Sequence, residues 1–165
     1  MHMITSMKAQ PSAIRRELKQ SRPFPTAEQE AAVALPRTAD VIRVDLERAL
    51  EPFEITPQQY NVLRILRGSH PGSLPTLEIA ERMIERAPGI TRLLDRIEAR
   101  GLVARERCRE DRRRVLCTVT PAGLELLRKT DALVNQLEVK RIRRLLKGEL
   151  AKLVGMLDRL REEEA

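Results

Sequence analysis

Tryptophan is absent from this chain of 165 residues, and the other aromatic residues are rare: one tyrosine and two phenylalanines. A core must therefore be built from leucine, isoleucine, valine and alanine, which suits helices packed on helices. Two cysteines are too few for the disulfide framework of a small secreted protein. No apolar run approaches the roughly 20 residues of a membrane helix, and the first ten residues lack the apolar stretch of a signal peptide. We expect a soluble cytoplasmic protein without a membrane partner.

Positive charge is in excess. The chain has 31 lysines and arginines against 24 acidic residues, a formal net charge of +7. Such a balance favours a polyanionic partner, with nucleic acid ahead of an anionic membrane surface. Between Arg82 and Arg114 there are eleven basic and six acidic residues, a net of +5. Most of the excess charge therefore lies in one short segment.

Helical spacing of apolar residues dominates both ends of the chain. Residues 1–25 are polar, and we expect a partly mobile arm with a short helix that begins at Ser12. Residues 26–55 predict a long amphipathic helix that begins at the cap Thr26. Pro36 should kink or interrupt it, because proline lacks an amide donor and clashes with the preceding turn.

Residues 56–120 contain three helices followed by a change of period. Thr56 caps the first helix and Thr76 the second, while Pro88 stands at the start of the third. After Gly101 the apolar period changes from 3.6 to about 2, which predicts two strands, 102–108 and 114–120, joined by a polar turn. This order is that of a winged helix-turn-helix unit, whose second helix enters the major groove of DNA. The expected fold class is mainly α with a small β-hairpin wing (α+β).

Residues 121–165 predict two further helices, with Thr120 as the first cap and a break at Gly148. Their apolar stripes, together with that of residues 26–55, are too long for a small winged-helix core to cover. We therefore expect these segments to pair two copies of the chain, which would place the two DNA-reading helices about 34–36 Å apart. The residues expected to need a partner surface are Leu124, Leu127, Leu133, Leu137, Leu145, Leu150, Leu153, Met156, Leu157 and Leu160.

The helix after Pro88 has a face suited to reading DNA. Its apolar residues fall at i, i+3, i+4 and i+7, the spacing of a buried stripe: Ile90, Leu93, Leu94 and Ile97. On the other side, Arg92 can bind guanine through two hydrogen bonds, and Thr91 can touch a thymine methyl group or a phosphate. Arg96 lies at the flank of this face and is expected to bind the backbone.

The segment "GITRLLDRIEARGLVARERCREDRRRVLCTVTPAGLELL" resembles the MarR family of bacterial transcription regulators, and the resemblance extends over roughly residues 27–163. The family pattern has a Gly-Leu-Val strand start, an Asp-Arg-Arg wing and a strand that closes in Leu-Thr-Pro-x-Gly. Val119 stands where leucine is usual, and "ITPQQYNVLRIL" is similar to the family's second helix. The matching residues are Gly101, Leu102, Val103, Asp111, Arg112, Arg113, Thr120, Pro121 and Gly123.

The resemblance implies a homodimer that binds a pseudo-palindromic operator on double-stranded DNA. It implies that Arg113 enters the minor groove and that Asp111 braces the wing electrostatically. Many family members also bind a phenolic or other aromatic acid, so a small-molecule effector is a further expected partner. The complete set of expected DNA-contacting residues is Thr76, Pro88, Gly89, Thr91, Arg92, Arg96, Arg112, Arg113 and Arg114.

Cys108 and Cys117 bracket the basic turn and leave two alternatives open. A metal site is disfavoured because zinc needs about four ligands and no histidine lies nearby. If the turn centred between Arg112 and Arg113, the two cysteines would face each other and could form a disulfide. The alternation of Cys117 with Val115 and Val119 favours a small core residue instead. Peroxide-sensing family members carry a cysteine near the first helix, and this chain has none before Cys108.

We therefore predict a sequence-specific DNA-binding regulator, expected to be a dimeric repressor released by a small aromatic or phenolic ligand. The alternatives are a winged-helix adaptor that binds proteins instead of DNA, and a redox-responsive regulator that uses Cys108 and Cys117. No nucleophile elbow, phosphate loop or ligand-spaced cluster is visible, so we predict neither an enzyme nor a cofactor or metal site.

Overall fold

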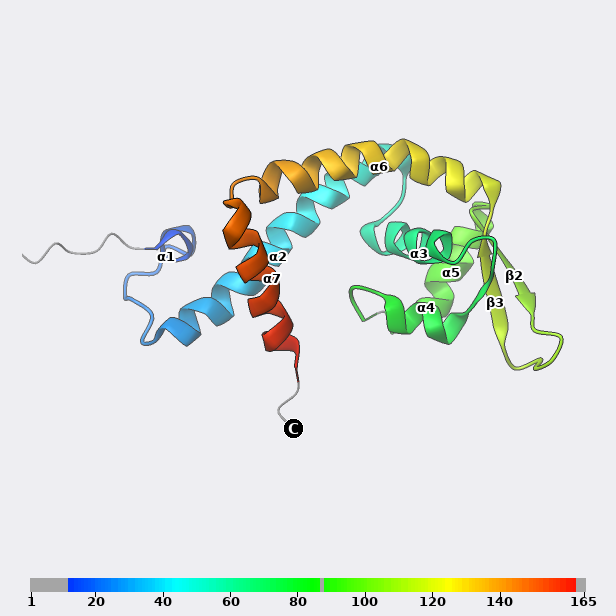
Figure 1. The fold of residues 1–165 in the computed structure, drawn as a ribbon, viewed down its shortest axis with the longest axis horizontal. Helices are drawn as coiled ribbons and strands as arrows, with labels where there is room; N and C mark the ends of the chain where they lie inside the picture. The colour runs from blue at the N-terminus through cyan, green and yellow to red at the C-terminus, as the bar shows by residue number, and fades with distance from the viewer. Residues whose placement is uncertain (1–11, 87, 163–165) are drawn as a thin grey trace, which may run out of the picture. The chain divides into compact units, whose positions relative to one another are not determined.

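The computed structural model describes residues 12–86 and 88–162, and the chain divides into two compact units, Met1–Val44 and Asp45–Ala165. Most of the described chain is helical, and the remainder includes a small three-stranded antiparallel sheet (Figure 1). The expected fold class, mainly α with a β-hairpin wing, is confirmed. The first eleven residues of the expected arm lie outside the described residues.

The first unit contains the short helix α1 (Ala13–Glu17) and most of the long helix α2 (Ala27–Leu50). Ser12 is the N-cap residue of α1, as expected, and the Thr26 hydroxyl accepts a hydrogen bond from the Gln29 amide at 3.3 Å. Helix α2 continues through Pro36, so the predicted interruption is wrong, while the alternative of a kink stays a prediction. Alanines, the strongest helix formers, precede Pro36 and offset the amide that proline lacks.

The second unit begins with the end of α2 and contains a helical core. A 3-10 turn, η1 (Glu51–Phe53), leads to α3 (Pro57–Gly68), α4 (Thr76–Arg82) and α5 (Ile90–Ala99). Thr56 and Gln59 form a capping box at the start of α3: the Thr56 hydroxyl accepts from the Gln59 amide, and the Gln59 side chain accepts from the Thr56 amide. The predicted cap and proline start of this helix are therefore confirmed.

The sheet has the order β1-β3-β2, with strands β1 (Leu74–Pro75), β2 (Val103–Arg107) and β3 (Val115–Val119). Both neighbouring pairs are antiparallel, and β2 and β3 form the expected hairpin. Strand β1 was not predicted, because two residues carry no readable period. It exists through its pairing with β3, where Leu74 lies opposite Cys117.

The core of the second unit lies where α3, α4, α5 and the sheet meet. Three of the four residues predicted as the buried stripe of α5 are buried, and Ile90 packs against the same cluster while remaining partly exposed. Gly123, near the start of the next helix, approaches this core closely: a Cβ atom there would lie 2.3 Å from the Leu102 carbonyl oxygen. The fully buried large side chains include Leu50, Leu63, Leu66, Ile79, Leu94, Ile97 and Leu127.

Two helices complete the second unit: α6 (Pro121–Ile142), which runs past α3 in Figure 1, and α7 (Lys147–Arg161). The predicted break lies earlier than Gly148, at residues 143–146, and Gly148 itself is in the first turn of α7. The Glu149 carboxylate accepts a hydrogen bond from the Leu146 amide at 2.8 Å and so fixes the new helix start. Neighbouring cations at the end of α6, Lys140, Arg141, Arg143 and Arg144, repel one another and favour an end there.

The set of residues predicted to need a partner surface wrongly includes its first two members, Leu124 and Leu127. Leu127 is fully buried in the core of the second unit, and Leu124 packs against that core. These two leucines therefore belong to the winged-helix unit, and the exposed apolar residues of α6 begin at Leu133. None of the helices among the described residues is long and apolar enough to cross a membrane.

Candidate nucleic-acid interface

Helix α5 presents a polar face to solvent. The helix begins at Ile90 with Gly89 as its N-cap residue, so the predicted start at Pro88 is wrong. Pro88 and Gly89 are both exposed just before the first turn. Thr91, Arg92 and Arg96 are exposed along the helix, on the side away from the buried stripe. The predicted face is therefore open to a ligand along the length of the helix.

The hairpin turn is held by Asp111. Its side-chain oxygen accepts a hydrogen bond from the Arg113 amide at 3.0 Å, and its carbonyl oxygen accepts one from the Arg114 amide at 2.9 Å. This is an Asx-type turn, in which a short polar side chain binds its own backbone two residues on. Asp111 thus braces the turn through backbone amides.

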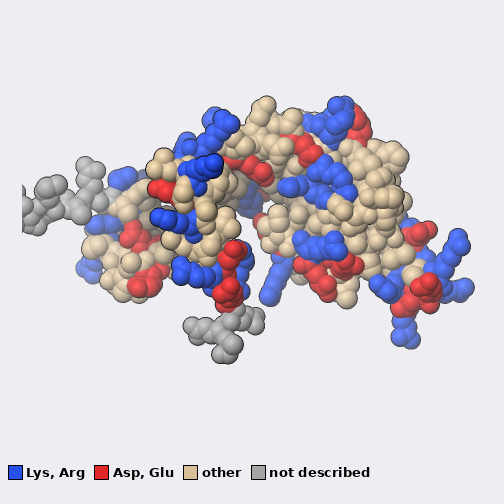
Figure 2. All heavy atoms as spheres, in the orientation of Figure 1, with Lys and Arg blue, Asp and Glu red and all other residues tan. Residues whose placement is uncertain are grey.

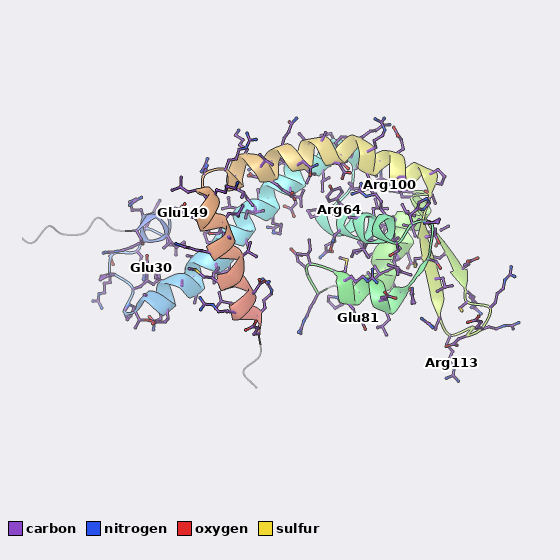
Figure 3. All side chains as sticks on the ribbon, viewed as in Figure 1. Glu30, Arg64, Glu81, Arg100, Arg113 and Glu149 are labelled. Carbon is purple, nitrogen blue, oxygen red and sulfur yellow. The ribbon has the colours of Figure 1, made fainter. Side chains whose placement is uncertain are left out.

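Arginines gather at the tip of the hairpin. Arg112, Arg113 and Arg114 are all exposed, and Arg113 projects from the end of the turn (Figure 3). Figure 2 shows basic side chains spreading from this tip around a few acidic ones. A cation on a narrow hairpin is well placed to enter a groove lined by phosphates.

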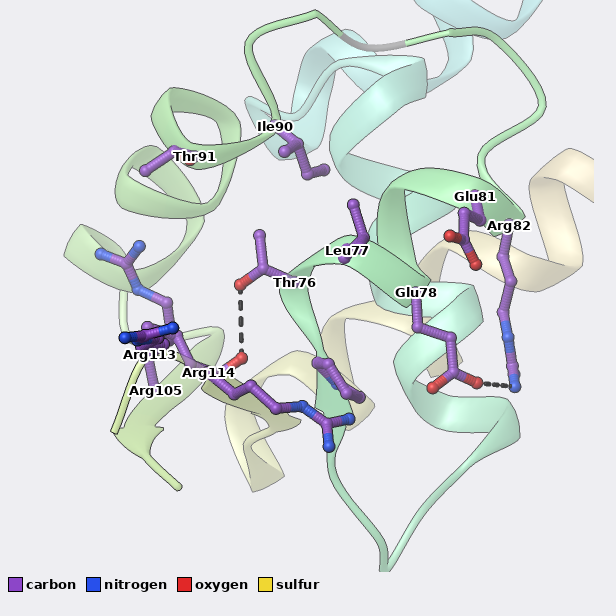
Figure 4. Close-up of a pocket in the computed structure, with 12 residues that line it drawn as sticks. Thr76, Leu77, Glu78, Glu81, Arg82, Ile90, Thr91, Arg105, Arg113 and Arg114 are labelled. Carbon is purple, nitrogen blue, oxygen red and sulfur yellow. Dashed lines mark hydrogen bonds and ion pairs between the residues drawn. The ribbon is translucent and has the colours of Figure 1, made fainter. Parts of the chain in front are cut away.

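A groove of about 910 Å³ lies between the hairpin, α4 and the start of α5 (Figure 4). Its walls combine cationic hairpin side chains with apolar, hydroxyl and charged groups of the two helices, and the charged groups of α4 include two carboxylates. The residues that line it are Pro75, Thr76, Leu77, Glu78, Glu81, Arg82, Ile90, Thr91, Arg105, Arg113, Arg114 and Val115. The structure therefore brings together Thr76, Thr91, Arg113 and Arg114, four residues of the predicted set.

Thr76 was expected to cap α4, and this is wrong: Pro75 is the N-cap residue, Thr76 is the first residue of the helix, and no side chain caps it. Thr76 instead has a role that the sequence did not indicate. It is half-buried, and its hydroxyl donates to the Val115 carbonyl oxygen at 3.4 Å, a contact drawn in Figure 4. The same hydroxyl lies 3.8 Å from the Cys117 sulfur. Thr76 therefore links α4 to β3 at the floor of the groove.

Arg105 in β2 is a residue that the sequence analysis missed. Its guanidinium Nη2 lies 2.6 Å from Asp95 Oδ1 and 2.6 Å from Glu98 Oε2, and both carboxylates belong to α5. The hydrogen bonds to Glu98, and secondarily to Asp95, raise the pKa of Arg105 above its ordinary value. The signal in the sequence was strand alternation, which places Arg105 on the same face as the buried Val103.

The two cysteines do not face each other. Cys117 pairs with Arg105, and the Cys108 amide donates to the Arg114 carbonyl oxygen at 2.9 Å. The turn is centred on Asp111 and not between Arg112 and Arg113. The register in which Cys108 and Cys117 would lie opposite each other and could form a disulfide is therefore wrong. Both thiols are free.

Burial decides the chemistry of Cys117. Its side chain is fully buried, and this burial raises the pKa of the thiol above its ordinary value. A smaller thiolate fraction makes the sulfur less reactive, as expected for a core residue. No group of three or more His, Cys, Asp or Glu side chains suited to a metal occurs within residues 12–86 and 88–162.

A polar cluster connects α3 to α6. The Tyr60 hydroxyl on α3 donates to Asp131 Oδ1 at 2.8 Å, and Arg67 forms an ion pair with the other oxygen of the same carboxylate. The Arg64 guanidinium lies 5.6 Å from the centre of the Tyr60 ring. Burial, together with the hydrogen bond to Asp131, raises the pKa of Tyr60 well above its ordinary value.

These features define the class of protein: a winged helix-turn-helix protein with an exposed helix face and a basic wing. Residues 55–115 match the family model described as MarR family. A MarR transcription factor from Planctomyces limnophilus is 41% identical to this chain, with 82% of this chain and 98% of that chain covered and a TM-score of 0.64. The chain belongs to the MarR family of transcription regulators.

Two more distant structures share the fold. Staphylococcus aureus MepR, solved as a complex with DNA, is 21% identical, with 78% of this chain and 94% of that chain covered and a TM-score of 0.73. Bordetella bronchiseptica BpsR, whose DNA binding is regulated by 6-hydroxynicotinic acid, is also 21% identical. In that comparison 87% of this chain and 100% of that chain are covered, with a TM-score of 0.75.

Proposed function

We propose that this chain is a transcriptional repressor that binds a pseudo-palindromic DNA operator as a homodimer. The observation that carries the proposal is the pairing of an exposed polar face on α5 with the arginine-tipped hairpin beside it. A helix of this width fits the major groove, while a narrow hairpin reaches the neighbouring minor groove or the backbone. The MepR complex, in which a protein of the same fold is bound to DNA, supports this partner.

The end of α6 and helix α7 support the homodimer. Apolar side chains remain exposed along both, including Leu146 at 73% and Leu160 at 66%. An extended exposed apolar surface of this kind is unusual for a monomer and marks a protein interface. The exposed large apolar residues of these helices and their connection are Leu133, Val139, Ile142, Leu145, Leu146, Leu153, Val154, Met156 and Leu160.

Selection of binding sites from a random duplex library tests the proposal. Each round retains the duplexes bound by the full chain, and the final pool is sequenced. We expect enrichment of two inverted half-sites about 10–10.5 base pairs apart from centre to centre, because a two-fold dimer presents its two recognition helices on one side of DNA. A pool without an enriched sequence, or with a single unrepeated half-site, contradicts the proposal.

The selected site also separates the roles of two arginines. Arg92→Ala should cost about 1–3 kcal/mol on this site and relax the preference at one base pair, because Arg92 reads a base edge. Arg113→Ala should weaken binding to the selected site and to a shuffled duplex by similar factors, because the wing contributes mainly charge. Equal losses on both duplexes for both variants would contradict this assignment.

We further propose that a small aromatic acid releases the operator. A cavity of about 490 Å³ between the end of α2 and α6, within the size range of small-molecule sites, supports this. Its walls combine apolar side chains with cations: Asp45, Arg48, Ala49, Pro52, Leu133, Leu137, Lys140, Arg141 and Arg144. Arg141 is already held by Asp45, with its Nε donating at 2.8 Å, which leaves the other cations for a carboxylate.

Thermal unfolding with and without a panel of aromatic carboxylates checks the effector. A compound that binds the folded chain should raise the melting temperature and lower operator affinity, since it must favour one state of the protein over the other. Arg48→Gln should reduce the shift in melting temperature. A panel in which no compound changes either quantity contradicts this part of the proposal and leaves DNA binding unaffected.

A further inference from the structure

Helix α5 carries two carboxylates beside its proposed DNA-reading residues. Asp95 lies one turn after Thr91, and its side chain is 53% exposed. Glu98 follows one turn later and is 37% exposed. Carboxylates in this position repel an approaching duplex, because every phosphate of the backbone carries a negative charge. A helix with this function therefore needs a cation that compensates them.

Arg105 in the hairpin is that cation. Its Nη2 atom donates to Asp95 Oδ1 at 2.6 Å and to Glu98 Oε2 at 2.6 Å, while its Nε atom donates to Glu98 Oε2 at 2.8 Å. The Arg105 side chain is only 20% exposed, so the planar guanidinium is held between strand and helix. Arginine suits this contact because its donors form a rigid fork that binds carboxylates at fixed angles.

The backbone of Arg105 is fixed as well. It pairs with Cys117 in the β2–β3 ladder, and Cys117 is fully buried in the core. The same two strands carry the turn that holds Arg113. The ion pairs of Arg105 therefore connect the strands that carry the wing directly to α5.

We propose that Arg105 is a positioning residue for DNA binding. It neutralises Asp95 and Glu98 on the side of α5 that faces DNA, and it fixes the hairpin relative to α5 so that helix and wing reach neighbouring grooves together. Arg105 acts through the two carboxylates and not by its own contact with phosphate. The inference rests on the DNA binding proposed above.

A double-mutant cycle tests this mechanism. Affinities for the selected operator are measured by fluorescence anisotropy for the wild type, Arg105→Gln, the pair Asp95→Asn and Glu98→Gln, and all three substitutions together. We expect Arg105→Gln to weaken binding about tenfold in the wild type and less than about threefold in the pair, because contacting residues couple. An equal loss in both backgrounds, or no loss in the wild type, would overturn the proposal.

Arg107→Gln is the matched control, since it removes one positive charge from an exposed position on the same strand. Its effect should be equal in both backgrounds. The folded state of each variant is checked by urea unfolding, and Arg105→Lys serves if Arg105→Gln does not fold.

Arg105→Lys also separates positioning from charge. Lysine keeps the charge but has no planar fork, so binding to a shuffled duplex should stay within about twofold of wild type while operator affinity falls about tenfold. Unchanged operator affinity in this variant would overturn the positioning role. The proposed function is tested separately, by binding of the wild type to the operator. That binding can be present even if the double-mutant cycle contradicts the role of Arg105.

Discussion

A single residue limits how closely α6 can approach the winged-helix core. Gly123, in the first turn of α6, faces the Leu102 carbonyl oxygen and the Val119 side chain, and a Cβ atom would lie 2.3 Å and 2.8 Å from them. Gly101 differs, since its φ of 68° requires glycine for conformational reasons. Both glycines belong to the motif by which the sequence resembles the family. Close packing explains the glycine at 123, and a positive φ explains the glycine at 101.

Gly123→Ala should lower the free energy of unfolding by about 1–3 kcal/mol, because the added methyl group overpacks a site bounded by backbone. Urea unfolding followed by circular dichroism measures this. Gly155→Ala is the control: it lies inside α7 with nothing within 4 Å of the added Cβ, and it should raise helix stability by up to about 1 kcal/mol. Equal effects from the two substitutions would contradict this account of Gly123.

At the scale of elements, most helix caps were predictable, with the exception of Thr76, whereas tertiary pairings were not. Thr56 and Thr120 were expected as caps, and both side chains accept an amide three residues on. A cap involves residues only three positions apart, so it can be recognised from the sequence alone. Strand β1 depends on pairing with a strand far away in the sequence, which no local signal gives. The hairpin register is set by the turn at Asp111, and it differs from the register that would place Cys108 opposite Cys117.

The candidate site was predictable to a similar degree. The exposed face of α5 followed from helical spacing, and the wing arginines followed from the polar turn between two strands. Arg105 was missed because its role depends on a contact between β2 and α5, which spacing alone does not give. The interruption expected at Pro36 does not occur, because neighbouring helix-forming residues offset the hydrogen bond that proline lacks.

The contact between α3 and α6 gives a prediction on pH. Folding raises the pKa of Tyr60, so the tyrosine stays protonated in the folded chain while it ionises in the unfolded chain near its ordinary value of 10.0. The free energy of unfolding should therefore fall as the pH rises above about 10, since the unfolded state then releases a proton that the folded state keeps.

Tyr60→Phe checks this assignment. It should cost about 1 kcal/mol at neutral pH, through the lost hydrogen bond to Asp131, and it should flatten the decline at alkaline pH. Stability is measured by urea unfolding at several pH values between 7 and about 11. A decline of equal steepness in wild type and variant would show that other groups cause it.

At the scale of the whole molecule, the net charge of +7 and the exposed apolar helices point to two different partners. The exposed apolar side chains of α6 and α7 are the surface of the proposed homodimer. The excess charge lies mainly between Arg82 and Arg114, in the winged-helix unit. The excess of basic residues in the sequence supports DNA binding more strongly once the structure is known, because most of the basic residues between Arg82 and Arg114 lie on α5 and the hairpin. A protein-binding adaptor of the same fold has no need for that concentration of charge.

The salt dependence of DNA binding tests the central claim most directly. Affinity for the selected operator is measured over a range of salt concentrations for the wild type and for a variant in which Arg112, Arg113 and Arg114 are all glutamine. Each neutralised phosphate contributes a slope of about 0.9 to the plot of log affinity against log salt. We predict a steep decline for the wild type and a slope smaller by about 1–3 for the variant. Weak binding that does not change with salt would contradict the claim that this surface binds DNA.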